Sequence, residues 1–150
     1  MPEGIGGIMK KYKIGYTTGV FDMFHIGHLN ILKRSKELCE FLIVGVSTDE
    51  LVQQYKHKKP VVSYDDRKAI VEAIRYVDQV VPQTSMDKLA AWERYHFDVV
   101  FHGDDWKGSA MYNSVEKALR EVDCEMVFLP HTVGISSTEL TKALYEHLHE

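Results

Sequence analysis

The sequence predicts an α/β protein with an open parallel sheet of about five strands and helices on both faces. Short apolar runs alternate with longer amphipathic segments along the chain. One run, Phe41–Val46, is almost entirely apolar, as is typical of a strand buried on both faces in the middle of a parallel sheet. Parallel neighbours need a crossover between them, so the alternation predicts right-handed strand–helix–strand units.

The predicted strands are short apolar runs bounded by polar or turn-forming residues. They are Lys13–Val20, Phe41–Val46, Gln79–Val81, Val99–His102 and Met126–Leu129. The carboxyl ends of such strands meet at one edge of an open sheet, where ligands bind. The segments expected to converge at that edge are Val20–His28, Phe101–Ser109 and Pro130–Thr138.

The segments between these strands place apolar residues at helical spacing. In Gly27–Cys39, for example, Leu29, Leu32 and Leu38 share one side, and the charged residues lie on the other. The stretch Ser47–Leu51 is predicted to start a short helix. The remaining predicted helices are Tyr64–Val77, Met86–Tyr95, Tyr112–Val122 and Ser137–His149.

The chain length of 150 residues suits one hydrophobic core and is too short for two comfortable domains. Residues 1–12 are rich in glycine and lack periodicity, so we expect a flexible N-terminal extension there. Residues 13–150 are then expected to form a single domain.

The composition, with 45% hydrophobic and 27% charged residues, is typical of a soluble globular protein. The net charge of −4 argues against a nucleic-acid partner, although a small polyanion needs only a local cationic pocket. No apolar run of membrane length and no signal peptide is evident, so no membrane partner is expected. Cys39 and Cys124 are therefore predicted to be reduced core thiols of a cytoplasmic protein.

The stretch GVFDMFHIGH, Gly19–His28, joins the first predicted strand to the first predicted helix. The first amide N–H groups of a helix lack partners and, with the helix dipole, favour an anion. Gly27 has no Cβ to obstruct a phosphate, and His25 and His28 lie on one side of the turn, where each neutral imidazole can donate an N–H. The pattern predicts a phosphate site. The structural alternative is that His25 caps the helix and His28 packs beside the sheet.

Two further segments carry polar groups suited to phosphates. The loop YKHKKP contains Lys56, Lys58 and Lys59, which are either a solvated charge run or a flexible cationic lid. The stretch ISSTE has the form of a capping box, with Ser136 followed three residues later by Glu139, and it opens a second helix start toward the same edge.

The segment HGDDWKG contains two adjacent carboxylates, on Asp104 and Asp105, which would repel a nearby triphosphate. These carboxylates are expected to hold a sugar, a base amine, a basic side chain or Mg²⁺. The alternative is a Gly/Asp turn in which Trp106 is a hydrophobic plug.

Together these segments resemble the cytidylyltransferases. GVFDMFHIGH is similar to the H-x-G-H signature of the nucleotidyltransferase superfamily, which shares its fold with class I aminoacyl-tRNA synthetases. The chain is too short and too acidic for a synthetase and lacks a K-M-S-K-S-like loop. Order and spacing are most similar to the branch acting on glycerol 3-phosphate, with features of the choline-phosphate branch. The matching segments, within about Lys13–Leu144, are RYVDQVVP (Arg75–Pro82), HGDDWKG (His102–Gly108) and HTVGISSTEL (His131–Leu140).

The resemblance implies a Rossmann-like domain of nucleotidyltransferase type, a homodimer, and a role for each matching residue. The catalytic residues would be Asp22, His25, His28 and Lys56. The nucleotide would be bound by Val20, Phe21, Gly27, Lys58, Asp105, His131, Thr132, Gly134, Ile135, Ser136, Ser137 and Thr138. The acceptor would be bound by Lys56, Lys88, Arg75 and Asp78. Mg²⁺ would be carried mainly by the triphosphate, with Asp22 as a possible protein ligand.

The chain departs from the family pattern in two places. Relatives usually read R-T-E-G-[IV]-S-T where this chain has His131 in place of the arginine and Val133 in place of the acid. Relatives also carry a tryptophan a few residues past R-Y-V-D, where Met86 lies here. The first departure bears on nucleotide affinity, and the second bears on the identity of the acceptor.

The sequence thus predicts an enzyme that transfers CMP from CTP to a small phosphomonoester, such as glycerol 3-phosphate or a similar alcohol phosphate, and releases pyrophosphate. One alternative is an adenylyltransferase that uses ATP on a sugar phosphate or a cofactor precursor. The other alternative is a nucleotide-binding module without turnover, which the substitutions at His131 and Val133 keep open.

Overall fold

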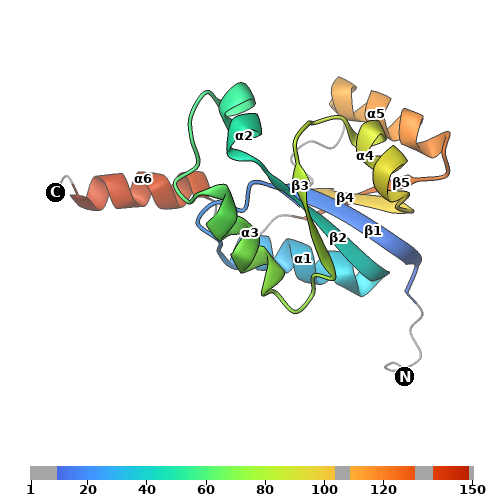
Figure 1. Cartoon of the computed structure of the whole chain (residues 1–150), viewed down its shortest axis with the longest axis horizontal. Coiled ribbons are helices and arrows are strands. Elements are labelled where there is room, and N and C mark those ends of the chain that lie inside the picture. Colours follow the sequence, from blue (N-terminus) through green and yellow to red (C-terminus); the bar gives the residue numbers. More distant parts are fainter. Residues whose placement is uncertain (1–9, 104–108, 131–136, 149–150) are drawn as a thin grey trace.

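The computed structural model describes residues 10–103, 109–130 and 137–148. Its centre is a parallel sheet of five strands in the order β3-β2-β1-β4-β5 (Figure 1). The strands are β1 (Tyr12–Gly19), β2 (Cys39–Ser47), β3 (Gln79–Gln83), β4 (Val99–Gly103) and β5 (Glu125–Leu129). The helices are α1 (Ile26–Leu38), α2 (Asp49–Lys56), α3 (Tyr64–Glu72), α4 (Lys88–Tyr95), α5 (Ala110–Arg120) and α6 (Ser137–Leu148). The predicted α/β fold with a parallel sheet is confirmed.

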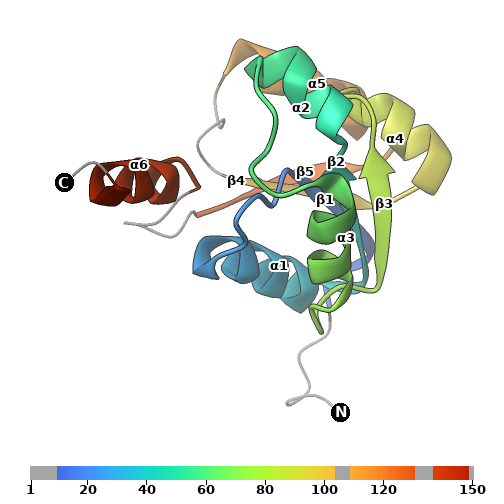
Figure 2. The same cartoon turned by 60° about the vertical axis from the view of Figure 1, so that its left-hand side comes forward.

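Alternate side chains of the central strands pack in two separate hydrophobic cores, because successive side chains of a strand point to opposite faces of the sheet. On one face, Leu42, Val44 and Val46 of β2 lie in a buried cluster beneath α1 and α3. On the other face, Tyr16 and Ile43 lie in a second cluster beneath α4 and α5 (Figure 2). Burial on both faces explains why the sequence of β2 contains a continuous apolar run.

The strand order creates a crevice at the carboxyl edge of the sheet. The chain passes from β1 outward to β2 and β3, and then returns to place β4 on the other side of β1. Thr17 of β1 donates its hydroxyl to the carbonyl of Phe101 in β4 at 3.0 Å, which ties the two strands at this point. A reversal of strand order next to β1 is where open α/β sheets bind ligands.

Several predicted boundaries are corrected by the structure. β1 begins at Tyr12, inside the stretch assigned to the N-terminal extension. Ser47 ends β2 instead of starting a helix, and Thr48 caps α2 by accepting the amide of Leu51. Helix α3 ends at Glu72, five residues before the predicted Val77, because the chain leaves the helix in short turns toward β3.

Both cysteines are free and buried, as predicted. Cys39 donates its thiol to the carbonyl of Ser35 within α1, and burial raises its pKa to about 11. Burial raises the pKa of Cys124 to about 12. Both thiols are therefore protonated at neutral pH and pack as small core side chains. Among the described residues, no helix is long and apolar enough to cross a membrane.

A buried arginine holds the carboxyl ends of two strands together. The guanidinium of Arg67, on α3, is fully buried and donates to the carbonyls of Val20, Ser47 and Val62 at 2.7–2.9 Å. It also pairs with the carboxylate of Asp49 at the start of α2, at 2.6 Å. One side chain thus fixes four segments that surround the carboxyl edge.

Replacing Arg67 by Met should lower the free energy of unfolding by about 3 kcal/mol, because it leaves a partly buried carboxylate and several carbonyls without their donor. Urea unfolding followed by circular dichroism measures this difference. The matched control is Arg34→Met, since Arg34 is solvent-exposed and pairs with Glu37 in the same helix. The control should change stability by less than about 0.5 kcal/mol. Equal effects of the two substitutions would contradict the structural role of Arg67.

Candidate active site

The turn between β1 and α1 is strained in a way that is common at functional sites. Phe21 and Met23 both have left-handed backbone conformations, with φ of 55° and 48°. Such residues cost of order 1 kcal/mol each and persist where surrounding structure holds them. Phe21 is 5% exposed, and a Cβ at Gly19 would lie 3.0 Å from its ring. Gly19 therefore allows the Phe21 ring to fold back under the turn.

The two histidines of the turn cap helix α1 reciprocally. His25 is the N-cap residue, and its Nδ1 accepts the amide N–H of Gly27 at 3.0 Å. The Nδ1 atom of His28 accepts the amide N–H of His25 at 3.2 Å. In a neutral imidazole one nitrogen accepts and the other carries the proton. The caps therefore place the proton of each ring on Nε2 and leave two Nε2–H donors at the start of α1.

These caps alter the predicted phosphate site in one respect. The first amides of the helix were expected to lack partners, but the amide of Gly27 donates to His25. The alternative interpretation, in which His25 caps the helix, is thus correct. This cap is compatible with a phosphate site because it uses only Nδ1 of the ring. Nε2 of His25 is buried and has no hydrogen-bond partner among the described residues. A buried donor without a partner is costly unless a ligand satisfies it.

Burial keeps both rings neutral. The rings of His25 and His28 stack with centroids 3.9 Å apart, and His28 also contacts the rings of Phe21 and Phe24. Burial lowers the pKa of His25. Burial lowers the pKa of His28 to about 4, and the nearby His25 ring contributes to this decrease. The carboxylate of Asp22 has a smaller effect in the opposite direction. Both rings are therefore neutral N–H donors at neutral pH.

Asp22, which is predicted to lie near the reacting phosphates, also holds the segment that follows the lysine-rich loop. Its two carboxylate oxygens accept the backbone amides of Val61 and Val62 at 2.7 and 2.9 Å. These residues directly follow the loop that carries Lys58. Asp22 and Arg67 together fix the position of this loop relative to the histidine turn.

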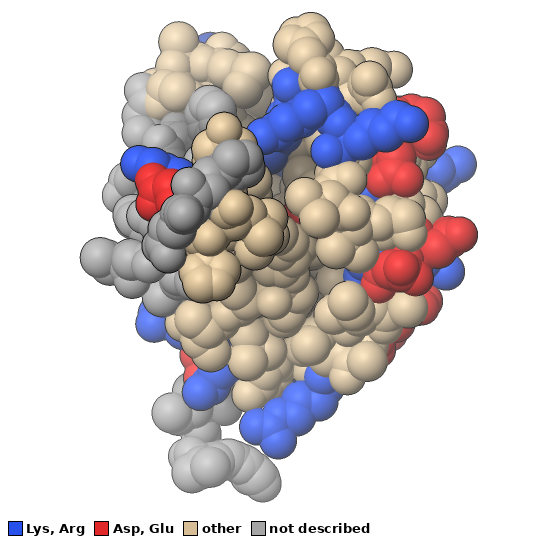
Figure 3. Space-filling model, turned by 90° about the vertical axis from the view of Figure 1, so that its left-hand side faces the viewer, with Lys and Arg blue, Asp and Glu red and all other residues tan. Residues whose placement is uncertain are grey.

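Lys56 and Lys58 are solvent-exposed beside this anchored segment. Lys56 ends α2, and its ammonium lies 5.8 Å from the ring centroid of Tyr55. Figure 3 shows the molecule from the side of the carboxyl edge, where Lys and Arg side chains gather along the upper margin. Long exposed lysines near an anchored loop are free to turn toward an anion, as the interpretation of a cationic lid requires.

Lys88 is a buried cation at the same edge. It is the first residue of α4, its side chain is 4% exposed, and its ammonium donates to the hydroxyl of Thr18 at 2.7 Å. Burial lowers its pKa to about 8. No carboxylate of a described residue pairs with it. A buried ammonium that donates to a hydroxyl and pairs with no described carboxylate is suited to receive an anion.

The structure corrects the prediction for Arg75 and Asp78. Both residues precede β3 and therefore lie at the amino end of that strand, at the opposite edge of the sheet. Asp78 accepts the amide of Leu42 and pairs with Lys36 at 2.5 Å, while the exposed Arg75 donates to the hydroxyl of Tyr76. Within the chain, neither side chain reaches the site at the carboxyl edge.

Part of the predicted nucleotide site lies outside the described residues. This part comprises Asp105, His131, Thr132, Gly134, Ile135 and Ser136. Asp104, Trp106 and Val133, which the sequence analysis also discusses, lie outside the described residues as well. Ser137 and Thr138 begin helix α6, so a second helix does start near this position in the chain. Val20 and Phe21 lie in the histidine turn, where Val20 offers its carbonyl to Arg67.

Sequence reasoning missed Arg67 and Thr18. Arg67 stands in the charged run Asp65–Lys68 on an amphipathic helix, which predicts an outward position, and no signal in the single sequence indicates its burial. Thr18 lies at the end of a predicted strand next to the histidine turn, and this position alone could have marked it as a site residue.

The arrangement can bind and polarise an anion. Two neutral Nε2–H donors, the start of α1 and the ammonium of Lys88 all lie at the carboxyl edge around β1. Among the described residues, no cluster of three or more His, Cys, Asp or Glu side chains could hold a metal ion. The two Nε2–H donors and the ammonium of Lys88 suit the described part of the site to phosphate binding and charge stabilisation.

This fold and this site define a protein of nucleotidyltransferase type. The family model described as Cytidylyltransferase-like matches residues 16–143, and the chain therefore belongs to the cytidylyltransferase-like family. The matched segment runs from β1 into α6 and includes the histidine turn, the lysine loop and Lys88.

Individual relatives agree with this assignment. The chain is 42% identical over 127 residues to a glycerol-3-phosphate cytidylyltransferase of Bacillus spizizenii, covering 84% of this chain and 92% of that protein. It is 35% identical over 127 residues to an ethanolamine-phosphate cytidylyltransferase of Mus musculus, covering 81% of this chain and 30% of that protein. A crystal structure of a lipopolysaccharide core biosynthesis protein from Thermoplasma volcanium has a similar fold, with a TM-score of 0.67, 23% identity and coverage of 81% and 97%.

The lowered pKa of Lys88 predicts a pH-dependent stability. Between pH 8 and 10.5 the unfolded chain keeps the Lys88 proton that the folded protein has lost, so the free energy of unfolding should rise with pH relative to a Lys88→Met variant. Urea unfolding of both proteins at several pH values across this window measures the difference. A difference that is constant across the window would show that Lys88 titrates normally.

Proposed function

We propose that the protein is a cytidylyltransferase that transfers CMP from CTP to a small alcohol phosphate, glycerol 3-phosphate or a close analogue, and releases pyrophosphate. The observation that carries the proposal is the pair of Nε2–H donors on His25 and His28 in a chain of the cytidylyltransferase-like family. The 42% identity to a glycerol-3-phosphate cytidylyltransferase over most of both chains supports the nucleotide and the acceptor class.

The proposed reaction is a single in-line displacement. An oxygen of the acceptor phosphate attacks the α-phosphorus of CTP, and the bond from that phosphorus to the oxygen bridging to the β-phosphorus breaks. Pyrophosphate leaves with the electron pair of that bond. The acceptor phosphate dianion brings no proton to be removed, so the step needs no general base. Position and charge stabilisation then account for catalysis, as is usual for such transfers.

The histidines would stabilise the charge that builds on the phosphates. Each Nε2–H would donate to an oxygen of the triphosphate, and both rings are held by their Nδ1 caps before the substrate arrives. Such prearranged donors cost no reorganisation during the reaction. Neutral donors also avoid the desolvation cost of a fixed cation at a buried position.

The lysines would hold the two anionic substrates against each other. Lys88 would bind the acceptor phosphate from below the crevice, and Lys56 would reach it from the loop side, while Lys58 would reach CTP. The acceptor and the triphosphate repel each other, so cations between them lower the cost of their approach.

Mg²⁺ is part of the proposal as a partner of CTP. It would neutralise charge on the triphosphate and orient its leaving oxygens. Asp22 is a weak candidate for a protein ligand, because both of its oxygens accept backbone amides of the lysine loop. The ion would therefore be carried mainly by the nucleotide.

We also propose that the enzyme acts as a homodimer in the cytoplasm. The proposal of a dimer rests on what the resemblance to the cytidylyltransferases implies. Two buried thiols with raised pKa values are compatible with a reducing compartment. Sedimentation equilibrium distinguishes a dimer of 17.3 kDa chains from a monomer.

A pyrophosphate-release screen tests the proposed function. It crosses CTP and ATP with a panel of phosphomonoesters. Release that requires CTP and an alcohol phosphate is the expected result. Release that requires ATP would replace the proposal by an adenylyltransferase, and nucleotide binding without release would replace it by a non-catalytic binding module.

Replacing His28 by Asn should lower kcat by about 10²–10³, the usual cost of one prearranged donor. The Asn side-chain oxygen can accept the amide of His25 in place of Nδ1, so the cap of α1 is kept while the Nε2–H is lost. The control is His147→Asn, since His147 is exposed on α6. Full activity of the His28→Asn enzyme would reject the proposed role.

Removal of single loop lysines should separate the two substrates. Lys56→Ala should raise the KM of the acceptor more than that of CTP, and Lys58→Ala should do the reverse, each by about tenfold or more for one lost charged contact. Lys68→Ala is the control, because Lys68 lies half-buried on α3 and pairs with Glu72 on the same helix. Equal effects of both loop variants on both substrates would mean that the loop is an undifferentiated cationic lid.

A further inference from the structure

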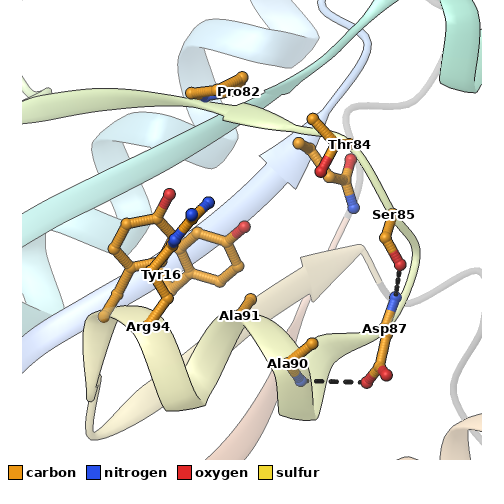
Figure 4. Close-up of a pocket in the computed structure, with 10 residues that line it drawn as sticks. Tyr16, Pro82, Thr84, Ser85, Asp87, Ala90, Ala91 and Arg94 are labelled. Carbon is orange, nitrogen blue, oxygen red and sulfur yellow. Dashed lines mark hydrogen bonds between the residues drawn. The ribbon is translucent and has the colours of Figure 1, made fainter.

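A pocket of about 210 Å³ lies between helix α4 and the end of β3 (Figure 4). Its floor includes Tyr16 of β1 and Gln83 of β3, which are 2% and 5% exposed. Thr84 and Ser85 form one wall, and Arg94 and Tyr95 of α4 form another. No role assigned above uses this pocket.

The pocket lies near Lys88, because the hydroxyl of Tyr16 in the pocket and the methyl group of Thr18, the partner of Lys88, lie 2.7 and 3.0 Å from the same point beside Gly45. Asp87 and Ala91, on either side of Lys88 in α4, both line the pocket. Tyr16 lies two residues before Thr18, the partner of Lys88, and therefore points to the same face of the sheet. A Cβ on Gly45 would come within 2.7 Å of the Tyr16 hydroxyl, so Gly45 is what leaves space for this hydroxyl beneath α4.

The polar groups of the pocket suit neutral hydroxyls. Gln83 accepts the hydroxyl of Ser47 at 2.7 Å through Oε1. Among the described residues, its Nε2 contacts only the weakly accepting sulfur of Met86, at 3.9 Å. The amide of Gln83 therefore has donor capacity left. Ser85 accepts the amide of Asp87 and keeps its own proton to donate. Hydroxyl and amide groups on several walls can pair with successive hydroxyls of a ligand.

The same pocket is unsuited to an ammonium group. Its one carboxylate, on Asp87, caps α4 by accepting the amides of Leu89 and Ala90. Arg94 lines the pocket and would repel a cation. Choline and ethanolamine phosphates carry a cationic nitrogen at the position that would enter the pocket, so they should be poor acceptors.

We infer that this pocket receives the hydroxylated tail of the acceptor, and that the preferred acceptor is a linear polyol phosphate longer than glycerol phosphate. The pocket volume of about 210 Å³ far exceeds the roughly 10–15 Å³ that a single water molecule needs, so it leaves room for hydroxylated carbons beyond the three of glycerol. The inference rests on the proposed function, since the phosphate of the acceptor must lie at Lys88 for its tail to enter the pocket.

The experiment compares kcat/KM with CTP for glycerol 3-phosphate, erythritol 4-phosphate, ribitol 5-phosphate, phosphoethanolamine and phosphocholine. A four- or five-carbon polyol phosphate should exceed glycerol 3-phosphate by about tenfold, the value of one or two additional neutral hydrogen bonds. Both ammonium-bearing acceptors should fall below glycerol 3-phosphate.

Two variants test whether the pocket causes this preference. Ala91→Leu fills the pocket and should lower the ratio of long-polyol to glycerol 3-phosphate kcat/KM by about tenfold, to near one. Tyr16→Phe removes only a hydroxyl and should lower the same ratio severalfold if Ala91→Leu fails to fold. The matched control is Ala69→Leu, an exposed alanine in the middle of α3, which should keep the ratio of the parent protein.

The outcomes separate the inference from the function on which it rests. Turnover in which glycerol 3-phosphate or an ammonium-bearing acceptor is preferred, or a preference that both pocket variants leave unchanged, would overturn the inference alone. Absence of CTP turnover with every acceptor would overturn the proposed function and the inference with it.

Discussion

Two imidazole nitrogens accept backbone amides at the start of α1, and the proposed chemistry depends on these two hydrogen bonds. Because Nδ1 of His25 and Nδ1 of His28 each accept a backbone amide, the proton of each neutral ring must lie on Nε2. The same bonds fix the two rings before any substrate binds. A short capping motif thus sets the tautomer and the direction of two hydrogen-bond donors, while burial keeps both rings neutral.

The parts of the site are joined by buried polar anchors. Arg67 links the carboxyl ends of β1 and β2 to α2 and to Val62, and Asp22 holds the amides of Val61 and Val62. The histidine turn and the lysine loop are therefore placed by common contacts, although about thirty residues separate them in sequence. Lys88 enters from the opposite face of the sheet, through α4, and meets the same edge at Thr18.

The sequence alone predicts the sheet well, because the strands of a parallel sheet covered on both faces are continuous apolar runs. Helix α3 was predicted too long because Ile74 and Val77 continue the apolar pattern while packing from turns. Arg67 could not be found, since its carbonyl partners come from segments distant in sequence. Arg75 and Asp78 were assigned to the acceptor by resemblance, but their position before β3 already places them at the wrong edge.

The tautomer of His25 and His28 is the most direct test of this account. Long-range ¹H–¹⁵N NMR spectra of the ¹⁵N-labelled protein at pH 7 distinguish protonated from unprotonated ring nitrogens, and His25→Asn and His28→Asn variants assign the signals. The account predicts two neutral rings with the proton on Nε2, and a change at Nε2 of both rings when CTP binds. Rings protonated on Nδ1 or on both nitrogens, or Nε2 signals that CTP leaves unchanged, would contradict it.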